Sequence, residues 1–306
     1  MKVRVKKIQG LTNDLLKPFP IDDEPYPTCK NPNLPRPFFL NVNAGQRGSG
    51  KTQLCCRLLK DCEDAGFVNE HGKAVPIRTI LISPTVDSNP IFKRLKTLDK
   101  ADIHTNYSEA GLLKLMEEIM ADRLATRKHK QVCVLWKQFK KYINRDVDPL
   151  KKMTKDELIL LSSATNCYRD DPAPPPHPLG QVVFLVLDDC LSTDAMSLNR
   201  TNKFSGFCMN SRHFWTSIIV NTQRLKACPP AIRSNITLAA IWRTCSAKIL
   251  LEEVWPSFSN ILTAEEFLAY YETATHRNRY DCLTINVMAA DGDQIRRNLN
   301  ERLKIE

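Results

Sequence analysis

Residues 45–52 read Gly45-Gln46-Arg47-Gly48-Ser49-Gly50-Lys51-Thr52, and this stretch decides the fold. It matches the pattern G-x-x-x-x-G-K-[ST] at every fixed position. It also lies between an apolar segment at 38–43, which predicts a strand, and a predicted helix over 51–65. Glycines let the loop backbone approach a ligand closely, and the loop N–H groups and the helix N-terminus then surround phosphate oxygens. The stretch, extended by Gln53, therefore predicts a nucleotide phosphate site; the alternative is a chance match on a glycine-rich turn.

Four side chains carry the chemistry expected of this loop. Lys51 is predicted to reach the β- and γ-phosphates of ATP, and the Thr52 hydroxyl to hold Mg²⁺. Residues 182–188 form an apolar run that ends in an acid, so Asp188 is the predicted second Mg²⁺ ligand. Asp189 follows directly and is placed to activate an attacking water as a general base. A second acid favours hydrolysis of the nucleotide over binding alone.

Apolar strands alternate with helical patterns along the chain. Strands are predicted at 38–43, 79–83, 182–188, 217–221, 237–242 and 282–287. Helices are predicted at 51–65, at 112–124, at 132–143, and after the capping boxes Thr154-Glu157 and Thr263-Glu266. Strands that are apolar on both faces indicate a mostly parallel sheet covered by helices, which is an α/β fold.

Composition divides the chain into an arm, a main domain and a tail. Seven prolines within 18–37 favour extended backbone, so residues 1–37 are interpreted as a Pro-rich N-terminal arm wrapped on the domain or on a neighbouring subunit. Residues 38–290 form the predicted ATPase domain. The stretch 104–178 is long for one crossover between strands and is interpreted as a helical insertion. Residues 291–306 are interpreted as a C-terminal tail.

The charge and cysteine content restrict the class of protein. Lys plus Arg is 44 and Asp plus Glu is 34, which gives a net charge of 44 − 34 = +10 and a pI near 9.1. This favours a polyanionic partner, nucleic acid or a membrane surface, over a merely basic soluble protein. The 11 cysteines include no C-x-x-C pair, which favours free thiols in a reducing compartment. No structural metal, signal peptide or transmembrane segment is predicted.

Much of the positive charge lies in one basic segment, residues 123–155. It contains 11 Lys or Arg and two acids, a charge of 11 − 2 = +9, interleaved with Trp136, Phe139 and Tyr142. Two interpretations stay open. In one, the basic face neutralises the phosphates of double-stranded DNA without reading sequence. In the other, an amphipathic helix pair docks a neighbouring subunit or a capsid protein.

Polar residues follow the predicted strand 217–221. The carboxyl ends of strands are where ligands bind in open α/β sheets. Gln223 is therefore a candidate to sense loss of the γ-phosphate or to position the attacking water. An ordinary loop glutamine is the alternative.

Taken in chain order, several segments resemble the FtsK–HerA superfamily of ATPases. Within it, the chain is most similar to the genome-packaging ATPases of large DNA viruses, of the poxvirus-like type, and to their virophage relatives. The resemblance covers about residues 38–290, and the ordered set is more specific than the phosphate loop alone. Its parts are 45–52, Asp188-Asp189, Asn210-Ser211-Arg212-His213, Thr222-Gln223-Arg224 and 229–235.

The resemblance implies further structure and partners. It implies a P-loop NTPase with an additional strand that places Gln223 between Lys51 and Asp189. It implies a homo-oligomeric ring, a hexamer, around double-stranded DNA, in which arginine fingers act across subunit interfaces. Arg212 is the first candidate for the finger and Arg233 the second; a surface or structural arginine is the alternative for each.

The function expected from this resemblance is an ATP-driven translocase of double-stranded DNA that packages a viral genome into a capsid. The expected partners are DNA, further copies of the chain, and a capsid or portal protein. The expected location is the host cytoplasm or a viral factory, with association to the virion. The alternatives are a cellular or plasmid DNA translocase or helicase of the same superfamily, and a P-loop kinase or nucleotide switch that does not act on DNA.

Overall fold

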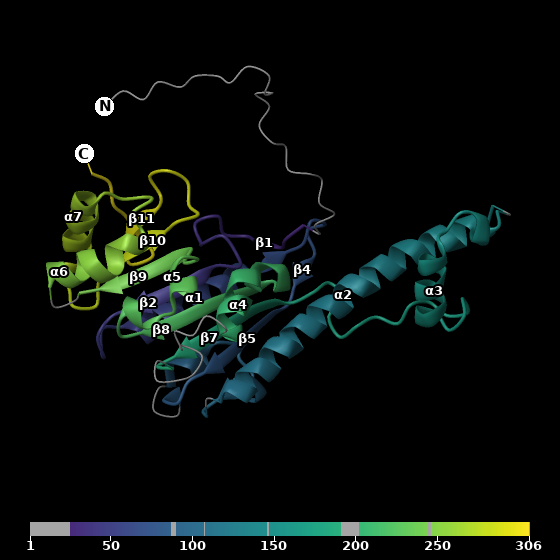
Figure 1. The fold of residues 1–306 in the computed structure, drawn as a ribbon, viewed down its shortest axis with the longest axis horizontal. Coiled ribbons are helices and arrows are strands. Elements are labelled where there is room, and N and C mark those ends of the chain that lie inside the picture. Colours follow the sequence, from purple (N-terminus) through teal and green to yellow (C-terminus); the bar gives the residue numbers. More distant parts are fainter. Residues whose placement is uncertain are drawn as a thin grey trace, which may run out of the picture.

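A nine-stranded sheet lies at the centre of the protein in the computed structural model (Figure 1). The strands β9 to β6 run parallel, whereas β10, β11 and β12 are added antiparallel at one edge. The mostly parallel α/β sheet predicted from sequence is therefore confirmed. From edge to edge the strands are β12 (Glu301–Arg302), β11 (Ile295–Arg297), β10 (Cys282–Asn286), β9 (Leu238–Trp242), β2 (Leu40–Ala44), β8 (Thr216–Thr222), β7 (Val182–Asp188), β5 (Ile77–Ile82) and β6 (Ile103–His104).

The position of β8 decides the geometry of the site. It lies between β2, which leads into the phosphate loop, and β7, which ends in Asp188. The additional strand implied by the resemblance is therefore present. Because these three strands are parallel, their carboxyl ends meet at one edge of the sheet, where Thr222 pairs with Ala44 and Asn221 with Asp188.

The apolar character of β7 follows from its burial on both faces. All seven of its residues are buried. Val183, Leu185 and Leu187 pack into the core on one face of the sheet, and Val182, Phe184 and Val186 into the core on the other. This alternation is the period-two geometry of a strand covered on both sides.

Helices cover the two faces unequally. α1 packs its buried cysteines and leucines on the face with Phe184, whereas the start of α2 and parts of α4, α5 and α7 pack on the face with Leu185. Both predicted capping boxes are confirmed, at Thr154 before α3 and at Thr263 before α7. The helices are α1 (Lys51–Ala65), α2 (Glu109–Ile143), α3 (Lys155–Ala164), α4 (Lys203–Asn210), α5 (Pro230–Arg233), α6 (Ala247–Ile249) and α7 (Ala264–Thr275).

Helix α2 is one continuous element where the sequence patterns predicted two. Its 35 residues span about 52 Å, and it projects diagonally away from the sheet with α3 packed near its far end (Figure 1). Its first part packs on the main core through residues such as Leu115 and Ile119. Its second part packs Leu135 and Phe139 against α3 in a separate small core. We call the projecting part, residues 127–170, the arm; it is a different segment from the Pro-rich N-terminal arm predicted over 1–37.

The middle of α2 is fixed to the sheet by a buried contact between Arg123 and Trp215, which we call the joint. The guanidinium of Arg123 lies 3.7 Å from the ring centroid of Trp215, the residue directly before β8. The Thr126 hydroxyl donates a hydrogen bond of 2.8 Å to the carbonyl of His177. Because Arg123 is only 3% exposed, its charge is directed inward. The arm is therefore attached to the amino end of β8.

Both chain ends of the described structure add to the main domain. Residues 25–37 lie along it and contribute β1 (Thr28–Cys29) to a small sheet with β3 (Phe67–Val68) and β4 (Ala74–Val75). The residues assigned to a tail from sequence carry β11 and β12, which extend the large sheet.

The structure describes residues 25–86, 90–106, 108–145, 147–190, 202–243 and 246–305, and only the backbone of Leu150. Residues 1–24 of the predicted Pro-rich N-terminal arm and Asp146 of the basic segment lie outside this set. None of the described helices, α2 included, combines the length and apolar character that a membrane span requires. None of the described cysteines forms a disulfide.

Candidate functional site

The phosphate loop has the backbone that its glycines predict. Gly48 and Gly50 adopt φ values of 74° and 104°, in the left-handed region. A Cβ on Gly45 would lie 2.8 Å from both Ser49 Oγ and Trp242 Cβ, so the loop closes only with glycine there. Gly45 N–H donates to the carbonyl of Thr222 over 3.1 Å, which ties the loop to the end of β8.

The ammonium of Lys51 lies inside this loop. Its Nζ donates to the carbonyls of Gly45 and Gln46 over 2.8 and 3.0 Å, and the side chain is buried. Burial lowers the pKa of Lys51, whereas the negative charges of Asp189 and Asp188 raise it. A desolvated cation in a loop of inward-facing N–H groups fits the phosphates of a nucleotide.

A chain of hydrogen bonds crosses three strands to the predicted magnesium ligands. Asn43 Nδ2 on β2 donates to Asn221 Oδ1 on β8 over 2.7 Å, and Asn221 Nδ2 donates to Asp188 Oδ1 over 2.7 Å. The Thr52 hydroxyl lies 3.4 and 3.5 Å from the two oxygens of Asp188. We call Asn43, Asn221 and Asp188 the relay, because each side chain orients the next.

The chemistry of Thr52 and Asp188 fits a magnesium ion. A hydroxyl and a carboxylate are hard oxygen ligands, and Mg²⁺ in nucleotide sites takes only a few protein ligands besides phosphate and water. Asp188 is 2% exposed, and burial raises its pKa while the Asn221 hydrogen bond lowers it. An ionised, buried carboxylate beside a hydroxyl is stabilised by a cation, so the residues present accommodate the ion that the loop pattern implies.

Asp189 differs from Asp188 in environment. It adopts φ 54°, is exposed, and lines the cavity beside the phosphate loop. The left-handed turn directs the two successive carboxylates to different places, one into the sheet edge and one into the cavity. Asp189 is thus accessible to a water molecule in the cavity, as a general base requires.

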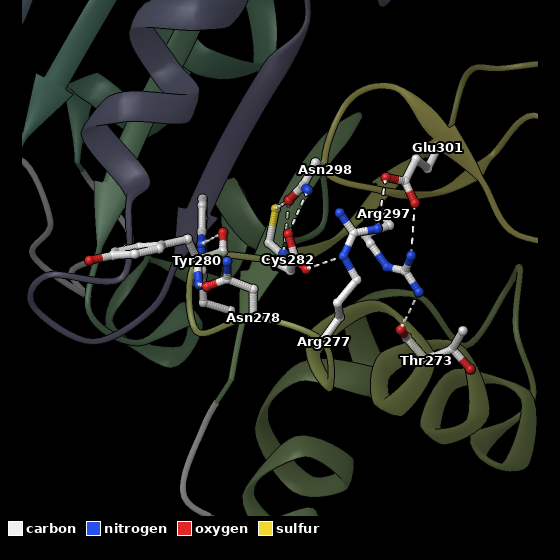
Figure 2. Close-up of polar contacts among 10 residues, drawn as sticks. Thr273, Arg277, Asn278, Tyr280, Cys282, Arg297, Asn298 and Glu301 are labelled. Atoms are coloured by element: carbon white, nitrogen blue, oxygen red, sulfur yellow. Dashed lines mark hydrogen bonds and ion pairs between the residues drawn. The ribbon is translucent and has the colours of Figure 1, made fainter.

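The cavity has a volume of about 810 Å³ and two unlike walls. Arg47, Gly48, Gly50, Lys51, Thr52 and Gln53 of the predicted set line one wall together with Asp189. Residues distant in sequence form the other: Trp242 at the end of β9, Tyr280 and Asp281 before β10, and Asn298 after β11. Figure 2 shows the part of this wall around Tyr280 and Asn298, where Asn298 contacts Cys282 and Tyr280 points away from the polar cluster.

The other predicted residues lie outside this cavity. Gln223 follows β8 at the same sheet edge and is exposed. Arg212 lies before β8, at the opposite edge, where it lines a second cavity of about 610 Å³. Since β8 has seven residues, its two ends are about 20 Å apart. Arg233 is half-buried on the connection from β8 to β9, and its Nε has no hydrogen-bond partner among the described residues.

The second wall and the two asparagines of the relay were not identified from sequence. Asn43 and Asn221 are buried amides near the carboxyl ends of central strands, but Asn41 on β2 is a buried amide as well, so residue type alone does not single them out. Tyr280, Asp281 and Asn298 are not marked by the sequence either, because antiparallel pairing of β10 and β11 brings them to the cavity.

Comparison with known proteins gives remote likenesses only. No protein-family model and no curated protein matches the chain. The genome packaging NTPase B204 from Sulfolobus turreted icosahedral virus 2, in complex with ATP-gammaS, is similar with a TM-score of 0.43 and 13% identity, over 88% of this chain and 100% of that one. EssC (ATPases 2 and 3) from Geobacillus thermodenitrificans gives 0.45 and 11%, over 84% and 38%. The pCW3 conjugation coupling protein TcpA gives 0.32 and 12%, over 82% and 57%. At these scores the likeness carries no weight, and the site is assigned from strand order and contacts.

Proposed function

We propose that the protein is an ATPase that moves double-stranded DNA, and that its task is to package a viral genome into a capsid. One observation carries the proposal: β8 connects the nucleotide site to the basic arm. At its carboxyl end Asn221 bonds to Asp188, and directly before its amino end Trp215 holds Arg123 of α2. A change at the phosphate end of β8 thus has a direct structural route to the arm.

The residues around the cavity support hydrolysis. Lys51 places a buried positive charge where the β- and γ-phosphates of ATP bind, and Thr52 and Asp188 hold Mg²⁺. The bound Mg²⁺ neutralises charge on the phosphoryl group. Asp189 accepts the proton of the attacking water, and Gln223, at the same edge, responds to loss of the γ-phosphate.

The surface of the arm supports contact with DNA phosphates. Lys128, Lys137, Lys141, Lys151 and Lys152 are exposed along it. Lys140 is already engaged, since its Nζ lies 2.6 Å from Asp171. Lysines on a helix surface neutralise phosphates without reading base sequence, which suits a motor that must act on any sequence.

A homo-oligomeric ring, with six subunits as the expected number, completes the proposed machine. Arg212 lies at the sheet edge opposite its own nucleotide site, so it serves the site of a neighbouring subunit. Arg233 is the second candidate for this role. The capsid or portal protein is the further partner proposed, and the packaging setting places the protein in the infected cell or at the virion.

The test is the ATPase rate of the purified protein with and without double-stranded DNA, at two salt concentrations. We expect strong stimulation that fades with salt, because phosphate contacts release counterions. The variant Lys137→Glu/Lys141→Glu should lose most of the stimulation, whereas the matched control Lys30→Glu/Lys73→Glu, exposed beside the small sheet, should keep it. A rate indifferent to DNA in a sample shown by its size to be assembled would reject the motor and favour a kinase or nucleotide switch.

A further inference from the structure

An aromatic side chain, Tyr280, lines the cavity and is exposed. Tyr280 is 52% exposed, although the neighbouring Trp242 is buried. A Cβ on Gly50 would lie 3.7 Å from its Cδ1, so the ring lies against the turn that starts α1. In Figure 2 the ring points away from the polar contacts of its own loop.

The backbone that carries Tyr280 is fixed on both sides. Its N–H donates to Asn278 Oδ1 over 3.1 Å, and its carbonyl accepts from Trp242 Nε1 over 3.0 Å. The next residue, Asp281, accepts from Asn298 Nδ2 over 2.8 Å (Figure 2). A half-exposed ring on a fixed backbone has fewer positions open to it, so binding a ligand there costs less ordering entropy.

The same loop is also tied to the neighbouring elements. Arg277 lies 3.4 Å from Glu301 at the edge of the sheet, and Arg297 lies 2.7 Å from the same carboxylate. Arg297 also donates to the carbonyl of Thr273 in α7 over 2.8 Å (Figure 2). These contacts connect α7, β11 and β12 behind the loop, so Tyr280 projects from a braced support.

A nucleotide whose phosphates lie in the loop extends along this wall. The same cavity is lined by Lys51, Gln53 and Tyr280, together with the buried Trp242. Arg279 covers one face of the Tyr280 ring, with its guanidinium 4.6 Å from the ring centroid. The Tyr280 side chain is still 52% exposed, so ring surface remains on which a flat, unsaturated group can stack, and a nucleobase is such a group.

The polar groups of this wall do not distinguish one purine from another. Asp281 Oδ1 is engaged with Asn298, and its Oδ2 is buried 4.0 Å from Arg277. Asn298 Oδ1 accepts from the Cys282 N–H. Gln53 is exposed, and its amide offers both a donor and an acceptor, so it pairs equally with a 6-amino or a 6-oxo edge.

We propose that Tyr280 is the platform on which the base of the bound nucleotide stacks, and that the site selects purine over pyrimidine nucleotides without choosing between adenine and guanine. The inference rests on the proposed nucleotide site and names the ligand class that it accepts. Stacking favours the larger purine ring, and it tolerates any base because every base has a π-face.

The test is calorimetric titration of the full chain with the magnesium complexes of ATP, GTP and CTP. For the wild type we expect similar affinities for ATP and GTP and a weaker one for CTP. Tyr280→Ala should weaken both purine nucleotides by about 5- to 150-fold and remove the difference from CTP. Tyr280→Phe is the matched control, since it keeps the ring and should bind as the wild type does.

Each failure has a distinct meaning. If Tyr280→Ala binds ATP like the wild type, the platform is refuted while the nucleotide site stands. If the wild type binds ATP but not GTP, the inference that the site accepts both purines is refuted. If a folded wild type binds none of the three, the proposed function fails and this inference fails with it; a melting curve of the same sample establishes folding.

Discussion

The relay gives the sharpest prediction about the nucleotide site. Asn221→Leu removes the 2.7 Å hydrogen bond to Asp188 Oδ1 and leaves the Asn43 amide without its acceptor. Leucine has the same branched side-chain skeleton as asparagine, with two bulkier methyl groups, and it suits a buried strand, so the change acts mainly on polarity. We therefore expect loss of magnesium-dependent nucleotide binding in a protein that still folds.

The magnitude follows from the contacts. A hydrogen bond to a charged group contributes about 1.5–3 kcal/mol, which corresponds to about 10- to 150-fold in affinity for the magnesium-bound nucleotide. The orphaned amide of Asn43 costs a further ~1–3 kcal/mol in the free energy of unfolding. The affinity loss should appear with magnesium and be much smaller without it, because the relay acts on Asp188 rather than on the phosphate loop.

The pH dependence distinguishes positioning from a general loss of stability. Burial raises the pKa of Asp188 and the Asn221 hydrogen bond holds it down, so the variant raises this pKa further. A protonated carboxyl does not bind Mg²⁺, and the affinity of the variant should therefore recover as the pH rises. In the empty site the raised pKa of Asp188 also affects stability: the folded state is most stable below the ordinary carboxyl pKa, and this stability is lost as the pH rises to the raised pKa.

The assay is calorimetric titration of a non-hydrolysable ATP analogue with and without Mg²⁺ across a pH series. Asn41→Leu is the control, because Asn41 is 1% exposed on the same strand as Asn43 and its Oδ1 has no hydrogen-bond partner among the described residues. It should bind nucleotide normally at every pH. If Asn221→Leu and Asn41→Leu behave alike, the relay has no role in holding Asp188.

Three further changes test the loop, the arm and the joint. Lys51→Ala should abolish turnover without lowering the melting temperature, since it removes a buried charge; full activity would refute the site. Lys137→Glu with Lys141→Glu should reduce the slope of log affinity for DNA against log salt by about two, and an unchanged slope would reject the arm as the contact. Arg123→Met keeps the buried stem but loses the cation–π contact with Trp215, worth about 2 kcal/mol when desolvated. It should leave the basal ATPase rate unchanged and lower the DNA-stimulated rate; equal stimulation would show that the joint transmits nothing.

The central strands were predictable because their environment is uniform. A strand covered on both faces needs apolar residues at every position, as Val182–Leu187 shows, and such runs stand out in a sequence. The edge strands have no such apolar runs and do not stand out in the sequence. β11 reads Ile295-Arg296-Arg297 and β12 reads Glu301-Arg302, and both are held by pairing and ion pairs rather than by burial on two faces.

Helix α2 shows a second limit. Its apolar residues change faces near Arg123, because the first part faces the sheet core and the second part faces α3. The change in pattern predicted an interruption, yet the intervening residues 125–131 include no glycine or proline to end a helix. A charged residue that stacks on Trp215 fills the gap in the apolar stripe, and sequence periodicity does not register such a contact.

The candidate site likewise has a part that local sequence patterns predict and a part that they do not. The phosphate loop and the two acids at the end of β7 are local sequence patterns, so residue spacing is enough to find them. The wall with Tyr280 is assembled from three segments whose proximity depends on the antiparallel edge of the sheet. Only the tertiary fold brings them beside the loop.

The orientation of β8 also restricts any role for Arg212. Lys51 lies at the carboxyl edge of the sheet and Arg212 at the amino edge, about 20 Å away along a buried strand. A strand packed between two others in a dense core does not invert or slide by that length, so no motion within one protomer brings the two side chains together. If Arg212 is the finger, the amino edge of one subunit must face the carboxyl edge of the next, and this head-to-tail contact generates a ring where the rotation closes. Self-association is then a requirement of the chemistry, and the joint at Trp215, close in sequence to Arg212, lies near that interface.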